Sequence, residues 1–234
     1  MTLTGTQTFS PAIKSASNYM RWVADAFAPH AHGRMQEVGI EHGEYREYWR
    51  EIGTYAGIDH DAVCIDSARS KYPADRYDVV DITDPLSVDS IRDEGLDSIC
   101  FVNVFEHIEQ DEVAIAALFD ALKTGGHMII WVPGMRVLYN ALGRLAGHER
   151  RYTRASLRSV LPPGCVIKAL HYVKPIGGFG WFAQKLRSID SLADERVGSR
   201  IRFFDKHCVP LSRAMTPLTR SIFGQSVFGV IQKP

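Results

Sequence analysis

Apolar positions along the first 132 residues switch between a helical period and a strand period. Residues 18–27 carry Tyr19, Trp22, Val23 and Phe27 at spacings of three and four, which predicts an amphipathic helix. Short apolar runs bounded by turn residues are typical of strands. We expect such strands at 34–38, 54–58, 77–80, 97–103 and 127–132.

Helical spacing between these runs predicts helices over 45–52 and 112–122. Lys123-Thr124-Gly125-Gly126 should end the second helix, because glycine accepts the left-handed conformation that a helix C-terminus needs. Alternation of strand and helix is typical of a doubly wound, mostly parallel sheet. The sequence therefore predicts an α/β fold.

The pattern is looser after Gly134. A helix is expected over 153–161 and strands over 165–172 and 226–232, which brings the predicted sheet to seven strands. The aromatic, glycine-marked stretch 177–223 is interpreted as a helical insertion that forms a lid or an acceptor wall. We expect one domain over 1–234. Its parts are a cofactor-binding core over 15–133, acceptor-side loops and the insertion over 134–225, and a final strand over 226–234.

Charge and cysteine content exclude several classes of protein. Lysine plus arginine and aspartate plus glutamate both total 27 in 234 residues, so the basic field of a nucleic-acid-binding protein is absent. The four cysteines are far apart and form no metal or redox pair, so we expect reduced packing residues. The first ten residues lack a leader pattern, and no run approaches about 18 apolar residues. We expect a cytoplasmic protein without a transmembrane segment.

Polar residues gather directly after the predicted strands, where a doubly wound sheet binds its ligands. Glu37-Val38-Gly39-Ile40-Glu41-His42-Gly43 follows the first strand, and Asp59 follows the second. Asp81-Ile82 follows the third strand, and Asn103 with Phe105-Glu106-His107-Ile108 follows the fourth. This ordered set resembles the class I S-adenosylmethionine-dependent methyltransferases. The resemblance implies a Rossmann-like methyltransferase fold, S-adenosylmethionine as cofactor and S-adenosylhomocysteine as product.

The resemblance also implies roles for individual cofactor-binding residues. The Asp59 carboxylate can accept both ribose hydroxyls, while Asp81 and the backbone N–H of Ile82 would hold adenine. Gly39 and Gly43 let the backbone approach the cofactor. Glu37 would help to hold the loop and the methionine end, and Asn103 lies where the fourth strand meets the cofactor. The alternatives are a purely structural βα turn, and at Asp81 a turn with a helix cap.

Glu41 replaces the middle glycine of the family's E-x-G-x-G-x-G loop. If this position has a positive φ, a non-glycine residue costs on the order of 1–3 kcal/mol of strain. A carboxylate here would repel the pyrophosphate of NAD, whereas the sulfonium of S-adenosylmethionine is a cation. Glu41 thus argues against a dinucleotide, and it also keeps open a non-catalytic scaffold with a degenerate cofactor loop.

Two polar groups are candidates for work on the acceptor. His107 and His148 could take a proton from an acceptor hydroxyl. Arg150, Arg151 and Tyr152 could bind the acceptor, although a helix start capped by Thr153 explains the same residues. A metal site at the Glu106-His107 pair would need further ligands that are not apparent, so no metal is predicted.

The resemblance of 147–153 and 177–234 is to a bacterial subgroup, methyltransferase type 11/12-like, that is associated with glycan and lipid-sugar assembly. We therefore expect methylation of a small or glycan-type acceptor at oxygen. The aromatic stretch at 177–182 could line an acceptor pocket or touch lipid, although packing in the core or in a homodimer explains it better. A scaffold role and, less favoured, an NAD(P)-dependent oxidoreductase are the alternatives.

Overall fold

The computed structural model describes residues 15–92, 95–139, 143–144, 146–177, 199 and 201–234. Seven strands form one sheet in the order β3-β2-β1-β4-β5-β7-β6. Neighbouring strands from β3 to β5 are parallel, and β7 is antiparallel to both β5 and β6. The strands are β1 (Arg34–Val38), β2 (Thr54–Asp59), β3 (Arg76–Val79), β4 (Leu96–Val102), β5 (Leu122–Pro133), β6 (Val166–Val173) and β7 (Ser226–Gln232). The predicted α/β fold with a mostly parallel seven-stranded sheet is confirmed.

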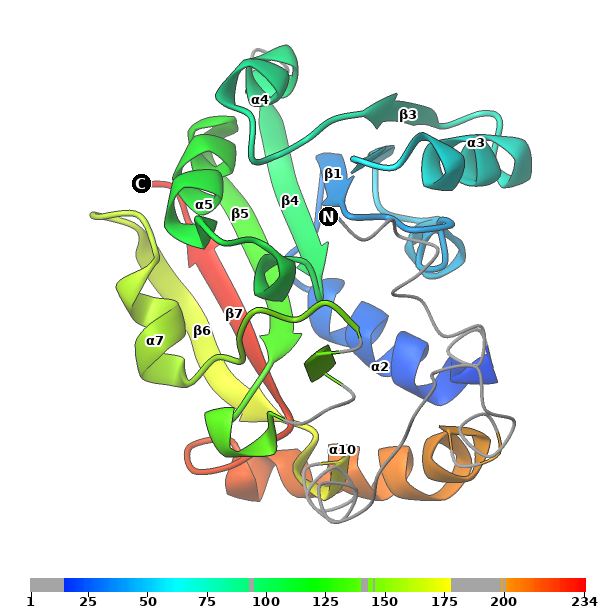
Figure 1. Cartoon of the computed structure of the whole chain (residues 1–234), viewed down its shortest axis with the longest axis vertical. Helices are drawn as coiled ribbons and strands as arrows, with labels where there is room; N and C mark the ends of the chain where they lie inside the picture. Colours follow the sequence, from blue (N-terminus) through cyan, green and yellow to red (C-terminus); the bar gives the residue numbers. More distant parts are fainter. Residues whose placement is uncertain (1–14, 93–94, 140–142, 145, 178–198, 200) are drawn as a thin grey trace.

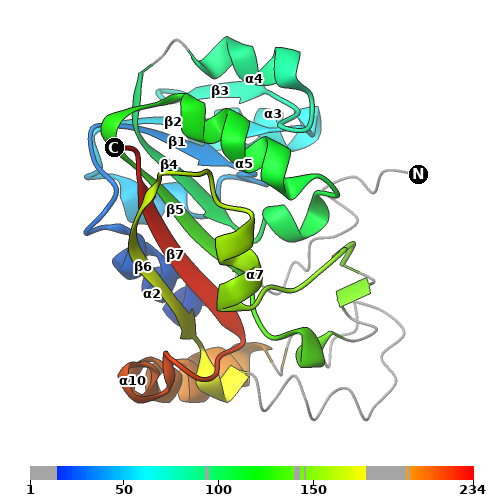
Figure 2. The same cartoon turned by 90° about the vertical axis from the view of Figure 1, so that its left-hand side faces the viewer.

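Helices cover both faces of this sheet (Figures 1 and 2). The longer helices are α2 (Ser17–Phe27), α3 (Ala62–Lys71), α4 (Pro85–Arg92), α5 (Asp111–Asp120), α7 (Arg154–Ser159) and α10 (Val209–Thr219). The shorter ones are η2 (Arg46–Trp49), η3 (Phe105–His107), η4 (Arg136–Leu138) and η5 (Phe204–Cys208). Within the described ranges, none of the helices has the length and apolarity that crossing a bilayer requires.

Successive side chains along each strand point to opposite faces of the sheet, and they form two apolar clusters, one on each face. In β5, Met128 and Ile130 join the cluster under α4, α5 and α7, while Ile129 and Trp131 join the cluster under α2, α3 and α10. Burial of both faces explains why the central strands read as continuous apolar runs. The sheet is therefore the middle layer of three, and its strand ends alone are free to carry polar chemistry.

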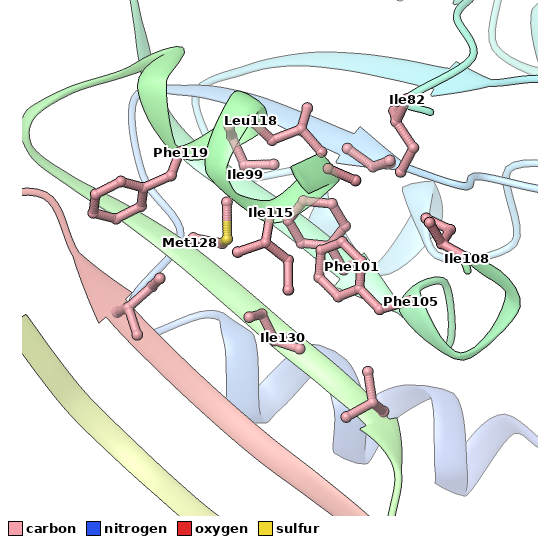
Figure 3. Packing of buried hydrophobic residues seen from close by; sticks show 14 of the residues in the cluster. Ile82, Ile99, Phe101, Phe105, Ile108, Ile115, Leu118, Phe119, Met128 and Ile130 are labelled. Carbon is pink, nitrogen blue, oxygen red and sulfur yellow. The ribbon is translucent and has the colours of Figure 1, made fainter. Parts of the chain in front are cut away.

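The cluster under α5 is shown in Figure 3, where side chains of β4 and β5 meet those of the helix. Phe101 of β4 and Phe105 of η3 pack with ring centroids 4.4 Å apart, and both are fully buried. Full burial of a side chain of this size stabilises the fold by about 1.5–3 kcal/mol. This packing fixes the turn after β4, which carries Asn103 and the residues that follow it.

Two predicted elements are wrong. The helix expected over 45–52 is only the 3-10 turn η2, because Trp49 is drawn into the core, where it stacks between Phe27 and Tyr45 at centroid distances of 5.7 and 5.4 Å. The other error is the helix stop expected at 123–126. Helix α5 ends at Asp120 and β5 begins at Leu122, so these residues belong to the strand.

The glycines of that strand have a different task from the one predicted. Gly125, at a φ of +83°, donates its N–H to the carbonyl of Lys233, and the N–H of Lys233 donates to Gly126. The pair therefore lets β5 hold the segment after β7. The structure also adds α3 and α4, which lie in polar stretches without a clear apolar stripe and were not predicted.

The insertion expected over 177–223 is helical where it is described. Helix α10 packs beside α2 and β6, and η5 leads directly into α10. Residues 178–198 and 200, including most of the aromatic stretch at 177–182, lie outside the described residues. All four cysteines are free thiols, as predicted.

Candidate active site

The loop after β1 is held in a conformation that its glycines permit. Gly39 and Gly43 both have a φ of +71°, and Glu41 between them has a φ of +50°. A Cβ on Gly39 would lie 2.6 Å from Cγ2 of Val104 in the turn after β4. Only glycine fits there, because both the backbone conformation and the neighbouring strand end exclude a side chain. The left-handed conformation considered for Glu41 is present.

Asp59, at the end of β2, ties this loop to the sheet. Its carboxylate is buried and accepts the N–H of Glu41 through Oδ2 and that of Asp61 through Oδ1, each at 3.0 Å. Nδ1 of His60 lies 3.3 Å from Oδ1, and hydrogen bonding to Asp59 raises the pKa of His60. A carboxylate oxygen has two lone pairs, so Asp59 keeps capacity for hydroxyl donors such as those of a ribose.

Glu37 is a second buried carboxylate beside the loop. Tyr55 of β2 donates its hydroxyl hydrogen to Glu37 Oε2. Burial, with smaller contributions from the charges of Glu41 and Asp59, raises the pKa of Glu37 to about 8, and the hydrogen bond from Tyr55 and the charge of Arg46 oppose this rise. Three carboxyl groups therefore surround the loop, and the negative charges of Glu41 and Asp59 favour a cation over a phosphate there.

Asp81 and Ile82 follow β3, the strand next to β2. Asp81 is exposed, and its Oδ1 accepts from both the backbone N–H and the hydroxyl of Thr83, at 2.9 and 2.7 Å. Ile82 packs into the core, and Asp84 accepts from the N–H of Leu86 at the start of α4. The turn and helix cap weighed for this segment are thus present, and the adenine role of Asp81 and Ile82 stays a prediction.

A polar group that joins Asn103 to three residues outside the predicted site lies beside the end of β4. Asn103, at a φ of +56°, donates its N–H to the carbonyl of Trp131. Its side chain is hydrogen-bonded to the hydroxyl of Tyr19. Burial raises the pKa of Tyr19 to about 12. Asp205 of η5 accepts the N–H of Tyr19, so the segment before α10 is joined to α2.

Lys174, directly after β6, completes this group. Its Nζ lies 4.0 Å from the ring centroid of Tyr19, and burial lowers its pKa to about 7. The charge of Arg151 contributes to this shift in the pKa of Lys174, and the charge of Asp205 opposes it. No motif surrounds Lys174 in the sequence, so its contact with Tyr19 of α2 could not be predicted from the neighbouring residues.

The predicted bases His107 and His148 lie together, although 41 positions separate them. Their ring centroids are 4.9 Å apart and nearly perpendicular, and Nε2 of His148 lies 4.0 Å from Oε1 of Glu106. Burial raises the pKa of Glu106 to about 8, lowers that of His148 to about 3 and also lowers that of His107. Both imidazoles are therefore neutral at physiological pH, and their role as bases stays a prediction.

Arg150, Arg151 and Tyr152 all have partners within the protein. Arg150 forms an ion pair with Asp111 at 2.9 Å, and the buried Arg151 donates to the carbonyls of Gly134 and Gln225. The Tyr152 hydroxyl contacts Asp111 Oδ2 at 2.5 Å. Thr153 caps α7 through a capping box, as the alternative explanation of this segment expected. Binding of an acceptor by these three residues stays a prediction and would require exchange of these contacts.

Known proteins match this chain in one sequence domain and in its fold. Residues 36–130 match the methyltransferase domain family. No curated protein matches the sequence. Among solved structures, a S-adenosylmethionine-dependent methyltransferase from Archaeoglobus fulgidus is similar at a TM-score of 0.59 and 17% identity, over 92% of this chain and 93% of that one.

Two further structures show the same fold. A putative methyltransferase of Haloferax volcanii, solved in complex with the Trm112 activator, gives a TM-score of 0.65 at 15% identity, over 98% of this chain and 97% of that one. Phosphoethanolamine N-methyltransferase 2 of Haemonchus contortus, solved with S-adenosyl-L-methionine, gives 0.59 at 17% identity, over 93% of this chain and 52% of that one. Residues 36–130 thus match a methyltransferase domain family, and the chain as a whole shares the fold of these methyltransferase structures.

Proposed function

We propose that this protein is a methyltransferase that moves the methyl group of S-adenosylmethionine to an oxygen of a small or glycan-type acceptor. The observation that carries the cofactor part is the set of carboxyl groups around the loop after β1, which includes Glu37, Glu41 and Asp59. A sulfonium cation and ribose hydroxyls suit such a loop, and a pyrophosphate does not. Binding of NAD(P) is disfavoured for the same reason.

The acceptor would be held at the same edge of the sheet, near the end of β4. An acceptor oxygen attacks the methyl carbon while the carbon–sulfur bond breaks, and sulfur keeps the bonding electrons as S-adenosylhomocysteine forms. The acceptor proton leaves to a nearby base or to water. Because the sulfonium is already activated, alignment of the two partners is the main contribution of the protein. The choice of a glycan-type acceptor and of oxygen as the methylated atom is supported by the sequence resemblance of 147–153 and 177–234 to the glycan-associated subgroup.

Calorimetry with S-adenosylhomocysteine tests the cofactor site. We expect binding to the native protein and a loss of affinity of at least about tenfold in Asp59→Asn, because the variant keeps an oxygen acceptor for the loop and loses the charge that holds ribose hydroxyls. Asp66→Asn is the matched control, since Asp66 lies exposed on α3 with Arg69 as its partner. That variant should bind as the native protein does.

The outcome also separates the alternatives. Failure of the native protein to bind S-adenosylhomocysteine would contradict the proposal and favour a scaffold in which Glu41 marks a lost cofactor site. Stabilisation by NADPH in thermal unfolding would favour an oxidoreductase. For the acceptor, the protein should transfer a labelled methyl group to a hydroxylated sugar, and the label should stay on the sugar in mild base, as a methyl ether does. Label found on nitrogen or carbon instead would contradict that part of the proposal.

A further inference from the structure

Glu106 is a buried carboxyl group without a hydrogen-bond partner. Its side chain is 0% exposed, and neither Oε1 nor Oε2 accepts or donates a hydrogen bond within the described part of the chain. Buried polar side chains are normally paired, and a carboxyl group left alone weakens the folded state. Glu106 therefore lacks the partner that its burial requires.

Two imidazoles face this carboxyl group. Nε2 of His148 lies 4.0 Å from Glu106 Oε1, too far for a hydrogen bond, and His107 packs against His148. His107 Nδ1 lies 3.1 Å from the carbonyl oxygen of Gly147. Because a carbonyl can only accept, Nδ1 carries the hydrogen, and Nε2 of His107 keeps its lone pair. Metal-binding histidines are typically oriented in this way by a backbone carbonyl.

The separations match a shared ligand better than mutual hydrogen bonds. One donor atom from each of Glu106, His107 and His148 lies within 4.8 Å of the other two. Donors bound to one tetrahedral cation at about 2.0–2.2 Å are roughly 3.3–3.6 Å apart, so the widest separation has to close by at most about 1.5 Å to gather all three. We propose that Glu106, His107 and His148 form a binding site for a divalent first-row transition cation.

Charged groups from several elements act electrostatically on the three proposed ligands. Arg151 acts on both Glu106 and His148 and opposes a second cation, but its guanidinium is hydrogen-bonded to the carbonyls of Gly134 and Gln225. Glu41 adds negative charge near Glu106. His60 and Glu149 act on His107 with opposite signs.

The donor set selects the class of cation. Two imidazole nitrogens and one carboxylate suit Zn²⁺, Mn²⁺, Fe²⁺ or Co²⁺, whereas Mg²⁺ and Ca²⁺ prefer oxygen ligands throughout. Three protein donors leave coordination positions open. If the proposed function holds, an acceptor hydroxyl bound in such a position would lose its proton more readily. This last step rests on the proposed function, whereas cation binding itself does not.

Calorimetry with Zn²⁺ on chelator-treated protein tests the site. We expect one ion bound per chain and a loss of affinity of at least about 100-fold in Glu106→Gln and in His148→Gln. His32→Gln is the control, because His32 lies in a separate group of histidines against His127. It should bind as the native protein does, and Mg²⁺ should bind at least about 100-fold more weakly than Zn²⁺. Far-ultraviolet circular dichroism confirms that each variant is folded.

A second readout follows Co²⁺ by its visible absorption, which becomes stronger when protein ligands replace water and lower the coordination number. The native protein and His32→Gln should give the same spectrum, and His148→Gln should lose it. No Zn²⁺ binding by the native protein, or binding unchanged in Glu106→Gln and His148→Gln, would overturn the proposal. S-adenosylhomocysteine binding is measured on the same samples, so failure of the cation site and failure of the cofactor site are seen separately.

Discussion

The carboxylate of Asp59 accepts a 3.0 Å hydrogen bond from the backbone N–H of Glu41, and this contact holds the loop after β1 against the end of β2. The bond uses the backbone of Glu41 and is independent of its side chain. It therefore keeps the loop in place with a non-glycine residue at its centre. The strained position and the group that stabilises it lie 18 residues apart in sequence.

Glu41→Gly should stabilise the protein relative to Glu41→Ala. A residue with a Cβ in the left-handed region costs roughly 1 kcal/mol or more, and only glycine escapes that cost. Both variants remove the carboxylate, so their difference isolates the backbone. We expect the free energy of unfolding of Glu41→Gly to be higher by up to about 1 kcal/mol in urea titrations. At Glu47 in η2 the same pair should differ with the opposite sign, and a higher stability of Glu41→Ala would contradict the prediction.

Glu37 should make stability depend on pH. Burial raises its pKa from 4.5 to about 8, so the folded protein favours the protonated acid. Stability from this group is fully present below pH 4.5 and is lost as pH rises through about 8. Glu37→Gln cannot ionise, so its stability relative to the native protein should increase between pH 5 and pH 8, measured by urea unfolding without cofactor. Glu47→Gln, an exposed control, should show no such trend, and a flat difference for Glu37→Gln would contradict the expectation.

Lys174 should act in the opposite direction on the pH axis. Burial lowers its pKa from 10.5 to about 7, so the folded state disfavours the ammonium. Stability is lost as pH falls from 10.5 towards 7. Lys174→Met should therefore be stabilised relative to the native protein more at pH 7 than at pH 10 in thermal unfolding. Lys168→Met, on the exposed side of β6, is the control. An equal effect of Lys174→Met at both pH values would exclude a buried ammonium.

Tyr152→Phe should destabilise the fold. The Tyr152 hydroxyl oxygen lies 2.5 Å from Asp111 Oδ2 and 3.1 Å from the carbonyl oxygen of Phe105, and both oxygens can accept its hydrogen. Its removal leaves a buried carboxylate oxygen short of a partner, at a cost of about 1–3 kcal/mol. Chemical denaturation should show this loss without any acceptor present, and Tyr48→Phe on η2 serves as the comparison. A loss of methyl transfer at unchanged stability would instead support the acceptor role predicted for Tyr152.

Much of the sheet could be predicted because its signals are local. The strands at 34–38 and 226–232 agree with β1 and β7 in both bounds, since apolar runs between turn residues mark a strand buried on both faces. Gly39 and Gly43 could be identified because positive φ has a residue-type signature. Helix 45–52 failed because its aromatic spacing reflects packing of Trp49 against Phe27, a contact made across the chain.

The contacts that define the polar edge have no such local signature. His148 meets Glu106 across 42 positions, and Lys174 reaches Tyr19 across 155, so neither pair follows from spacing. The sequence alone placed the carboxyl end of each strand to within one residue, because the apolar run of a strand and the turn residues after it are local signals. Only the tertiary structure decided which residues far apart in the chain lie together and which charges are buried together, because both depend on the path of the whole chain around the sheet.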